Sequence, residues 1–208
     1  MADVYYTIAK EGNGVFKEKM SKFLSFAVMV RSAEEAKAVV KRYQNEYHDA
    51  RHVCWAYMIG PERKEWQLND NGEPSGTAGK PILGQINSFG LTDVLVVVVR
   101  YFGGIKLGTP GLIAAYREAA RIALEDAGKE EVHRMETVRI RFPYVNANDV
   151  MKLVKAEEIT VLERNFDNAC EMVLTFRQDY AERIIGKLKG VEGLWLEVVA
   201  GGQGTRGT

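Results

Sequence analysis

The chain has 208 residues, 46% hydrophobic and 27% charged, a composition typical of a folded globular protein with one large or two small domains. Its 28 basic and 28 acidic residues give zero formal net charge, which excludes the basic balance of a protein that coats nucleic acid. The longest apolar run, 94–99, is far shorter than the ~20 residues that span a bilayer. With no signal-peptide pattern at its start, the chain is expected to be cytoplasmic and not membrane-bound.

Strand and helix patterns alternate through the first 128 residues. In chain order they predict strand 4–9, strand 22–30, helix 32–47, strand 52–60, strand 65–68, helix 78–89, strand 93–101 and helix 110–127. Ser32 and Glu35 have the spacing of a capping box, which places the start of the first helix. The strand at 93–101 is so uniformly apolar that we expect both of its faces to be buried.

Gly128 is suited to end the third helix, and we place a domain boundary there, giving a first domain over 1–128. The second domain, 129–200, is predicted as strand 132–142, helix 146–156, strand 159–166, strand 170–177, helix 180–189 and strand 194–199. This βαββαβ order is that of a ferredoxin-like domain, so the fold class is α+β. The glycine-rich tail, 201–208, is expected to be disordered.

Small ferredoxin-like domains often bind RNA on aromatic side chains of their sheet. The aromatic pair that such domains use is not evident in this sequence. We interpret Phe142, Phe166, Phe176 and Trp195 as core residues rather than as a stacking surface.

The first glycine-rich run, "NDNGEPSGTAGKP" at 69–81, is not a phosphate-binding P-loop. A P-loop requires a hydroxyl residue after Gly79-Lys80 and a glycine five places before Gly79, but Pro81 and Pro74 occupy these positions. A weaker anion site remains open, because Gly76, Thr77 and Gly79 place backbone amides at the start of a helix. The alternative is that these glycines only form turns.

The second glycine-rich run, "RYFGGIKLGTPG" at 100–111, leads into the third helix with Gly103, Gly104 and Gly108. If the two runs converge, Lys80, Arg100 and Lys106 would surround one anion. The alternative for Arg100 is structural: it satisfies loop carbonyls or pairs with an acid such as Asp70.

The sequence offers few groups for catalysis. His52, Asp70 and Glu73 are the candidates near the first run, together with Cys54. Residues two apart on a strand lie roughly 6–7 Å apart at Cα, which is poor geometry for a Cys–His pair. Cys54 and Cys170 have no metal-ligand spacing, and we expect neither a metal nor a cofactor.

Four segments, "KMSKFLSFA", "ARHVCWAYMIG", "DNGEPSGTAGKPIL" and "VVVVRYFGGIKLGTPGLIAAY", together resemble the signature of the IMPACT family and its bacterial two-domain YigZ-like proteins. The resemblance implies a first domain like domain 2 of ribosomal protein S5, and a second domain similar to a ribosome-binding domain of elongation factor G. It also implies a link to translation, because the eukaryotic member restrains an amino-acid-starvation kinase pathway by binding the kinase's activator. Ala114 departs from the pattern, since relatives often carry an arginine there, and this weakens an anion site beside the third helix.

The resemblance implies no defined reaction. We therefore predict a non-enzymatic, translation-associated regulator that binds a protein, ribosome or RNA partner, with an anion at the glycine-rich runs; its oligomeric state stays open. The alternative is a hydrolase-like enzyme acting on a small anionic or peptide substrate in a cleft near Asp70 and Arg100. The predicted surface consists of His52, Asp70, Glu73, Gly76, Thr77, Gly79, Lys80, Arg100, Tyr101, Gly103, Gly104, Lys106 and Gly108.

Overall fold

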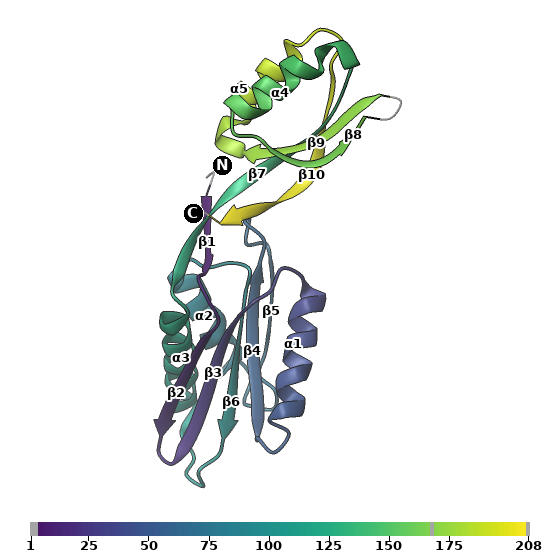
Figure 1. Cartoon of the computed structure of the whole chain (residues 1–208). Helices are drawn as coiled ribbons and strands as arrows, with labels where there is room; N and C mark the ends of the chain where they lie inside the picture. Colours follow the sequence, from purple (N-terminus) through teal and green to yellow (C-terminus); the bar gives the residue numbers. More distant parts are fainter. Residues whose placement is uncertain (1–3, 167–168, 207–208) are drawn as a thin grey trace. The chain divides into compact units, whose positions relative to one another are not determined.

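The computed structural model describes residues 4–166 and 169–206 of an α+β protein with antiparallel sheets. The chain divides into two compact units, the first over Tyr5–Glu131 and the second from Val132 onward together with the first four residues. Each unit has a sheet with helices packed on it (Figure 1). Within the described residues no helix is long and apolar enough to span a membrane.

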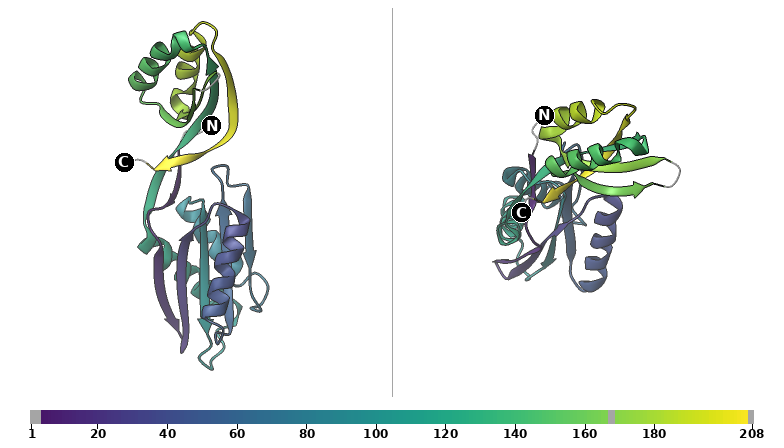
Figure 2. Two further views of the ribbon diagram at one scale, coloured as in Figure 1. Left: turned by 45° about the vertical axis from the view of Figure 1, so that its right-hand side comes forward. Right: turned by 45° about the horizontal axis from the view of Figure 1, so that its top comes forward.

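The first unit is a five-stranded antiparallel sheet with helices on both faces (Figures 1 and 2). Its strands, in spatial order, are β2 (Gly12–Glu18), β3 (Ser21–Met29), β6 (Val94–Tyr101), β4 (His52–Ile59) and β5 (Glu65–Asn69). One face packs on α1 (Ala33–Glu46), and the other packs on α2 (Gly79–Phe89) and α3 (Gly108–Ala127). The central strand β6 is buried from Val94 to Arg100, as its apolar sequence predicts.

The N-cap predicted for the first helix is present, and the second bond of the capping box is shifted by one residue. Ser32 occupies the N-cap of α1, and its hydroxyl accepts a hydrogen bond from the Glu35 amide at 3.1 Å. The Glu35 carboxylate in turn accepts from the Arg31 amide at 2.7 Å. The Ser32 hydroxyl therefore satisfies one orphan amide of the helix start, while the Glu35 carboxylate binds the amide one residue before the N-cap.

Strand β2 was not predicted, because its glycines lower β propensity. One of these glycines, Gly12, is required because α3 packs closely against the strand. A Cβ on Gly12 would lie 2.2 Å from the carbonyl oxygen of Ala123, so only glycine allows the strand and the helix to pack this closely.

The second unit follows the predicted βαββαβ order. Its elements are β7 (Lys129–Phe142), α4 (Ala147–Ala156), β8 (Thr160–Asn165), β9 (Cys170–Arg177), α5 (Ala181–Lys189) and β10 (Trp195–Arg206). These strands lie in the order β10-β7-β9-β8, and each neighbouring pair is antiparallel. Strand β1 (Val4–Ile8) also pairs with β7. Short 3₁₀ turns precede α4 and α5. Both helices cover the same face of the sheet (Figure 2).

Three of the four aromatic residues interpreted as core do belong to it. Phe142 and Phe176 are buried, and Phe166 packs against them at the edge of the core. Trp195 is instead 47% exposed, with the guanidinium of Arg141 lying 5.2 Å from its ring centroid. Residues 201–206, expected to be disordered, form the end of β10 instead, where Gly202 pairs with Met135; residues 207 and 208 lie outside the described residues.

Candidate functional site

The two glycine-rich runs meet at one pocket of the first unit, of about 420 Å³. The first run contributes Glu73 and Pro74, and the second contributes residues between Arg100 and the start of α3. Arg51 and His52, at the start of β4, complete its wall. We call this the basic pocket, since it brings together Arg51, His52, Arg100 and Lys106 with Glu73 as its one acidic side chain.

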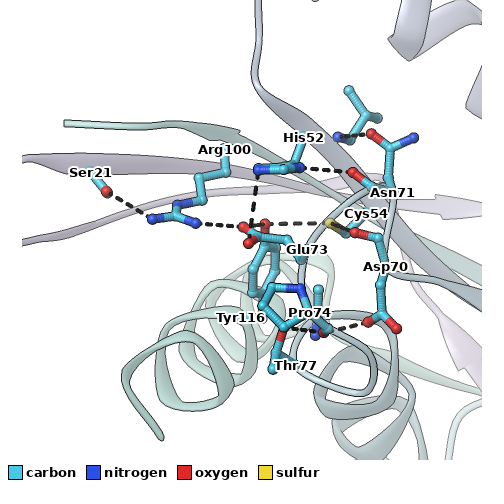
Figure 3. Close-up of polar contacts among 12 residues, drawn as sticks. Ser21, His52, Cys54, Asp70, Asn71, Glu73, Pro74, Thr77, Arg100 and Tyr116 are labelled. Atoms are coloured by element: carbon cyan, nitrogen blue, oxygen red, sulfur yellow. Dashed lines mark hydrogen bonds and ion pairs between the residues drawn. The ribbon is translucent and has the colours of Figure 1, made fainter. Parts of the chain in front are cut away.

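Glu73 is the centre of a buried polar network beside the basic pocket (Figure 3). Its Oε1 accepts a hydrogen bond from Nη1 of Arg100 at 2.6 Å and another from the hydroxyl of Tyr116 at 2.7 Å. Nε2 of His52 lies 3.8 Å from its Oε2. Arg100 therefore pairs with Glu73 rather than with Asp70, and the ion pair is held at 6% and 3% side-chain exposure. A buried carboxylate is tolerated only with partners of this kind.

His52 is held in place by the turn of the first glycine-rich run. Its Nδ1 donates a hydrogen bond to the carbonyl of Asn71 at 2.8 Å, and the Asn71 side chain accepts from the amide of Val53 at 2.8 Å. These two bonds tie the turn to the start of β4. They leave Nε2 facing the Glu73 carboxylate (Figure 3).

Asp70 caps α2. Its carboxylate accepts hydrogen bonds from the amides of Gly76 at 2.9 Å, Ala78 at 3.0 Å and Gly79 at 2.8 Å. Two of the donors that the sequence offered to an external anion, the amides of Gly76 and Gly79, are thus already bound to a carboxylate of the chain itself, and the amide of Thr77 donates to the carbonyl of Pro74 at 3.1 Å. Thr77 is also structural, since its hydroxyl donates to the carbonyl of Pro74 at 2.6 Å.

Eight of the thirteen residues of the predicted surface lie outside the wall of the basic pocket: Asp70, Gly76, Thr77 and Gly79 at the start of α2, and Lys80, Tyr101, Gly103 and Gly104. Lys80 is exposed on α2, and Tyr101 donates to Asp49 at 2.9 Å. Gly104 occupies a turn with φ +87. Gly103 packs against the β2–β3 hairpin, where a Cβ would lie 2.1 Å from the backbone of Met20.

The N-terminus of α3 forms part of the pocket wall through Gly108 and Thr109. Leu107 holds its N-cap position and has no side-chain acceptor, and the first turn contains no acidic residue. The free amides and the positive end of this 20-residue helix therefore favour an anion. Unlike α2, α3 has no carboxylate of the described residues bound at its start.

Sequence reasoning missed several residues of the site, chiefly Arg51, Phe102 and Tyr116. Arg51 adjoins His52 and its amide donates to the carbonyl of Arg100 at 3.1 Å, so strand pairing could have located it. Tyr116 carried no sequence signal, because it reaches Glu73 only through the packing of α3 on the sheet. Ala114, the departure from the family pattern, lies in a neighbouring hollow with Lys19 and Arg117 rather than in the basic pocket.

Cys54 is buried beneath the network. Its Sγ lies 3.0 Å from the carbonyl oxygen of Asp70 and 3.3 Å from the hydroxyl of Tyr116, and it is fully buried. Burial raises the pKa of the thiol to about 12, and burial likewise raises the pKa of Tyr116. A thiol that stays protonated is a poor nucleophile. Among the described residues, no group of three or more His, Cys, Asp and Glu side chains could hold a metal ion.

The raised pKa of Cys54 predicts a loss of stability in alkali. In the unfolded chain the thiol ionises near pH 9, whereas in the folded protein it stays protonated up to about pH 12. Between these values only the unfolded state is stabilised by ionisation, so stability falls by up to about 1.4 kcal/mol per pH unit for this group. Urea unfolding of the wild type and of Cys54→Ala at pH values from about 8 to 10.5 checks this, and the variant should show the shallower decline. Equal pH slopes would contradict it.

Comparison with known proteins confirms the resemblance carried by the signature segments. Residues 19–124 match the model of the Impact N-terminal domain. The chain is 32% identical over 178 residues to an IMPACT family member of Haemophilus influenzae, covering 84% of this chain and 86% of that protein. It is 44% identical over 108 residues to the IMPACT family member YigZ of Escherichia coli, covering 51% and 53%. The crystal structure of a hypothetical protein superposes with a TM-score of 0.75 at 27% identity, covering 96% of this chain and 98% of that chain. The chain therefore belongs to the IMPACT family, alongside the bacterial YigZ-like proteins.

Proposed function

We propose that the chain is a non-enzymatic, translation-associated regulator that binds an RNA, ribosome or protein partner through the basic pocket. Family membership supports the link to translation that the signature segments imply. The order β10-β7-β9-β8 supports a ferredoxin-like second unit, and the mixed sheet-and-helix layers of the first unit are compatible with the S5 domain-2-like fold. The role places the protein in the cytoplasm, and the two free cysteines accord with a reducing compartment.

The observation that carries the proposal is the positive charge of the basic pocket. Glu73 neutralises Arg100, whereas among the described residues neither Arg51 nor Lys106 forms an ion pair. Both are exposed, and they lie beside the uncapped start of α3. Although the whole chain has zero net charge, this pocket is locally positive and suits an anionic partner.

Ribosome sedimentation with charge-reversed variants tests this function. The wild type should sediment with ribosomes at low salt and be released as the salt concentration rises, because phosphate contacts are salt-dependent. Arg51→Glu and Lys106→Glu should each weaken the association, and each should lower the salt slope by about 1 for a lost phosphate contact. Lys41→Glu, an exposed lysine on α1 across the sheet, is the matched control.

Two outcomes would reject the function. One is a wild-type protein that stays in the top fractions at low salt and captures no translation component. The other is that Lys41→Glu weakens ribosome association as much as Lys106→Glu does, since the effect of charge would then not be specific to the basic pocket.

One observation favours a second candidate function, the hydrolase-like enzyme acting on a small anionic or peptide substrate. His52 lines the basic pocket, and its Nε2 lies 3.8 Å from the buried Glu73 carboxylate, so an imidazole and a carboxylate, the two groups most used in acid–base catalysis, lie together beside the pocket. Against this candidate, the nearby thiol of Cys54 has its pKa raised to about 12, and Glu73 already accepts two hydrogen bonds on one oxygen. An enzyme would lose turnover without losing stability when Asp70 or Arg100 is replaced.

A further inference from the structure

Part of the lining of the basic pocket is apolar. Phe102 lines the pocket with 44% of its surface exposed, and Pro74, Leu107 and Leu112 line the same pocket. The guanidinium of Arg100 lies 5.5 Å from the centroid of the Phe102 ring. A ring held in this way beside solvent is a stacking surface for a flat group of a ligand.

The polar, positively charged part of the lining comes from the start of α3 and the basic side chains. Lys106 and Arg51 flank the uncapped helix, whose Gly108 has φ +72 and lies in the pocket wall. A second observation also points to a ligand. Arg100 is 6% exposed at its side chain, lines the pocket, and its Nε has no hydrogen-bond partner in the described part of the chain. A buried guanidinium N–H without an acceptor is costly unless a ligand or water supplies one.

We propose that the basic pocket binds one phosphate-bearing nucleotide of a single-stranded RNA, with its phosphate at the start of α3 and its base on Phe102. This inference rests on the proposed function and names the ligand of the same site. The pocket volume of about 420 Å³ lies within the roughly 300–1,000 Å³ of small-ligand sites, which suits a single nucleotide rather than a duplex. RNA-binding proteins commonly read unpaired bases by stacking them on aromatic rings.

The geometry favours a nucleotide over a phosphorylated peptide. Phosphopeptide sites hold the phosphate mainly with clusters of free arginines. Here the Arg100 guanidinium is engaged by Glu73, which leaves only Arg51 and Lys106 as uncompensated permanent cations in the pocket. A phosphoserine has no flat group to stack on an exposed aromatic ring, whereas a nucleotide gains a second contact there through its base.

Titration of the full chain with three probes tests the inference: adenosine 5′-monophosphate, adenosine and inorganic phosphate, with binding followed by NMR or calorimetry at low salt. The monophosphate should bind about tenfold tighter than either fragment, since stacking and phosphate contacts act together. Lys106→Gln should weaken the monophosphate about fivefold or more. Phe102→Leu should weaken the monophosphate and leave phosphate binding unchanged. Lys41→Gln is the control and should bind as the wild type does.

The inference is overturned if the monophosphate does not bind at low salt, or if Phe102→Leu binds it as well as the wild type. It is also overturned if a phosphoserine peptide binds tighter than the monophosphate, which would assign the pocket to a phosphorylated protein. Ribosome sedimentation of the same variants distinguishes failure of the nucleotide inference from failure of the proposed function. Sedimentation that still depends on Lys106, without nucleotide binding, rejects the nucleotide and retains the proposed function; loss of both rejects both.

Discussion

Replacement of Arg100 by alanine is expected to lower the free energy of unfolding by about 3–5 kcal/mol. The variant leaves the Glu73 carboxylate buried and without its ion-pair partner. It also removes the guanidinium that packs 5.5 Å from the ring centroid of Phe23 and reaches the hydroxyl of Ser21. Urea unfolding followed by circular dichroism measures the loss.

Two further variants make the Arg100 result specific. Arg51→Ala removes an exposed cation from the same pocket and should change stability by no more than about 0.5 kcal/mol. Adding Glu73→Gln to Arg100→Ala removes the buried, unpaired negative charge of Glu73 and should restore part of the lost stability. If Arg100→Ala is as stable as the wild type, the ion pair is not what holds the two glycine-rich runs together.

The local elements were predictable because their signals lie close together in the sequence. Ser32 and Glu35 are three residues apart, and they define the start of α1 in the structure. The apolar run of β6 predicted a strand buried on both faces, and both faces are covered by helices. The order of the elements in the second unit followed in the same way from the spacing of strand and helix patterns.

The network around Glu73 was not predictable in this way, because its members are brought together only by the fold. Glu73 lies 27 residues from Arg100 and 43 from Tyr116 along the chain. Acids in glycine-rich turns usually form or cap the turn, so the sequence around Glu73 does not indicate that its carboxylate is buried. Burial changes its role, and burial depends on how α3 packs against the sheet.

The amides at 76–79 show a second limit of sequence reasoning. Glycines before a helix indicate free donors at its positive end, but they do not tell whether the acceptor is a ligand or a side chain. Asp70 is the acceptor here, six residues before the first of these amides. The amides that bind Asp70 are therefore not free for an external anion, whereas the N-cap residue of α3 makes no side-chain cap hydrogen bond.

Replacement of Asp70 by alanine is accordingly expected to lower the free energy of unfolding by about 2–4 kcal/mol. The change leaves three amides at the start of α2 without their carboxylate, and it removes a negative charge from the positive end of that helix. Asp70→Asn keeps one side-chain oxygen as an acceptor and should lose less. Differential scanning calorimetry and urea unfolding of both variants show whether Asp70→Ala loses more stability than Asp70→Asn.

The Asp70 variants also separate a structural carboxylate from a catalytic one. Asp49→Ala is the matched control, because Asp49 is exposed and accepts a single hydrogen bond from Tyr101; we expect a change within about 0.5 kcal/mol. An enzyme that used Asp70 as its acid would lose turnover in Asp70→Asn while its Tm stayed unchanged. We expect the opposite, because the Asp70 carboxylate already accepts three backbone hydrogen bonds and its removal should therefore lower the free energy of unfolding. Unaltered stability of Asp70→Ala would overturn the assignment of Asp70 as the cap of α2.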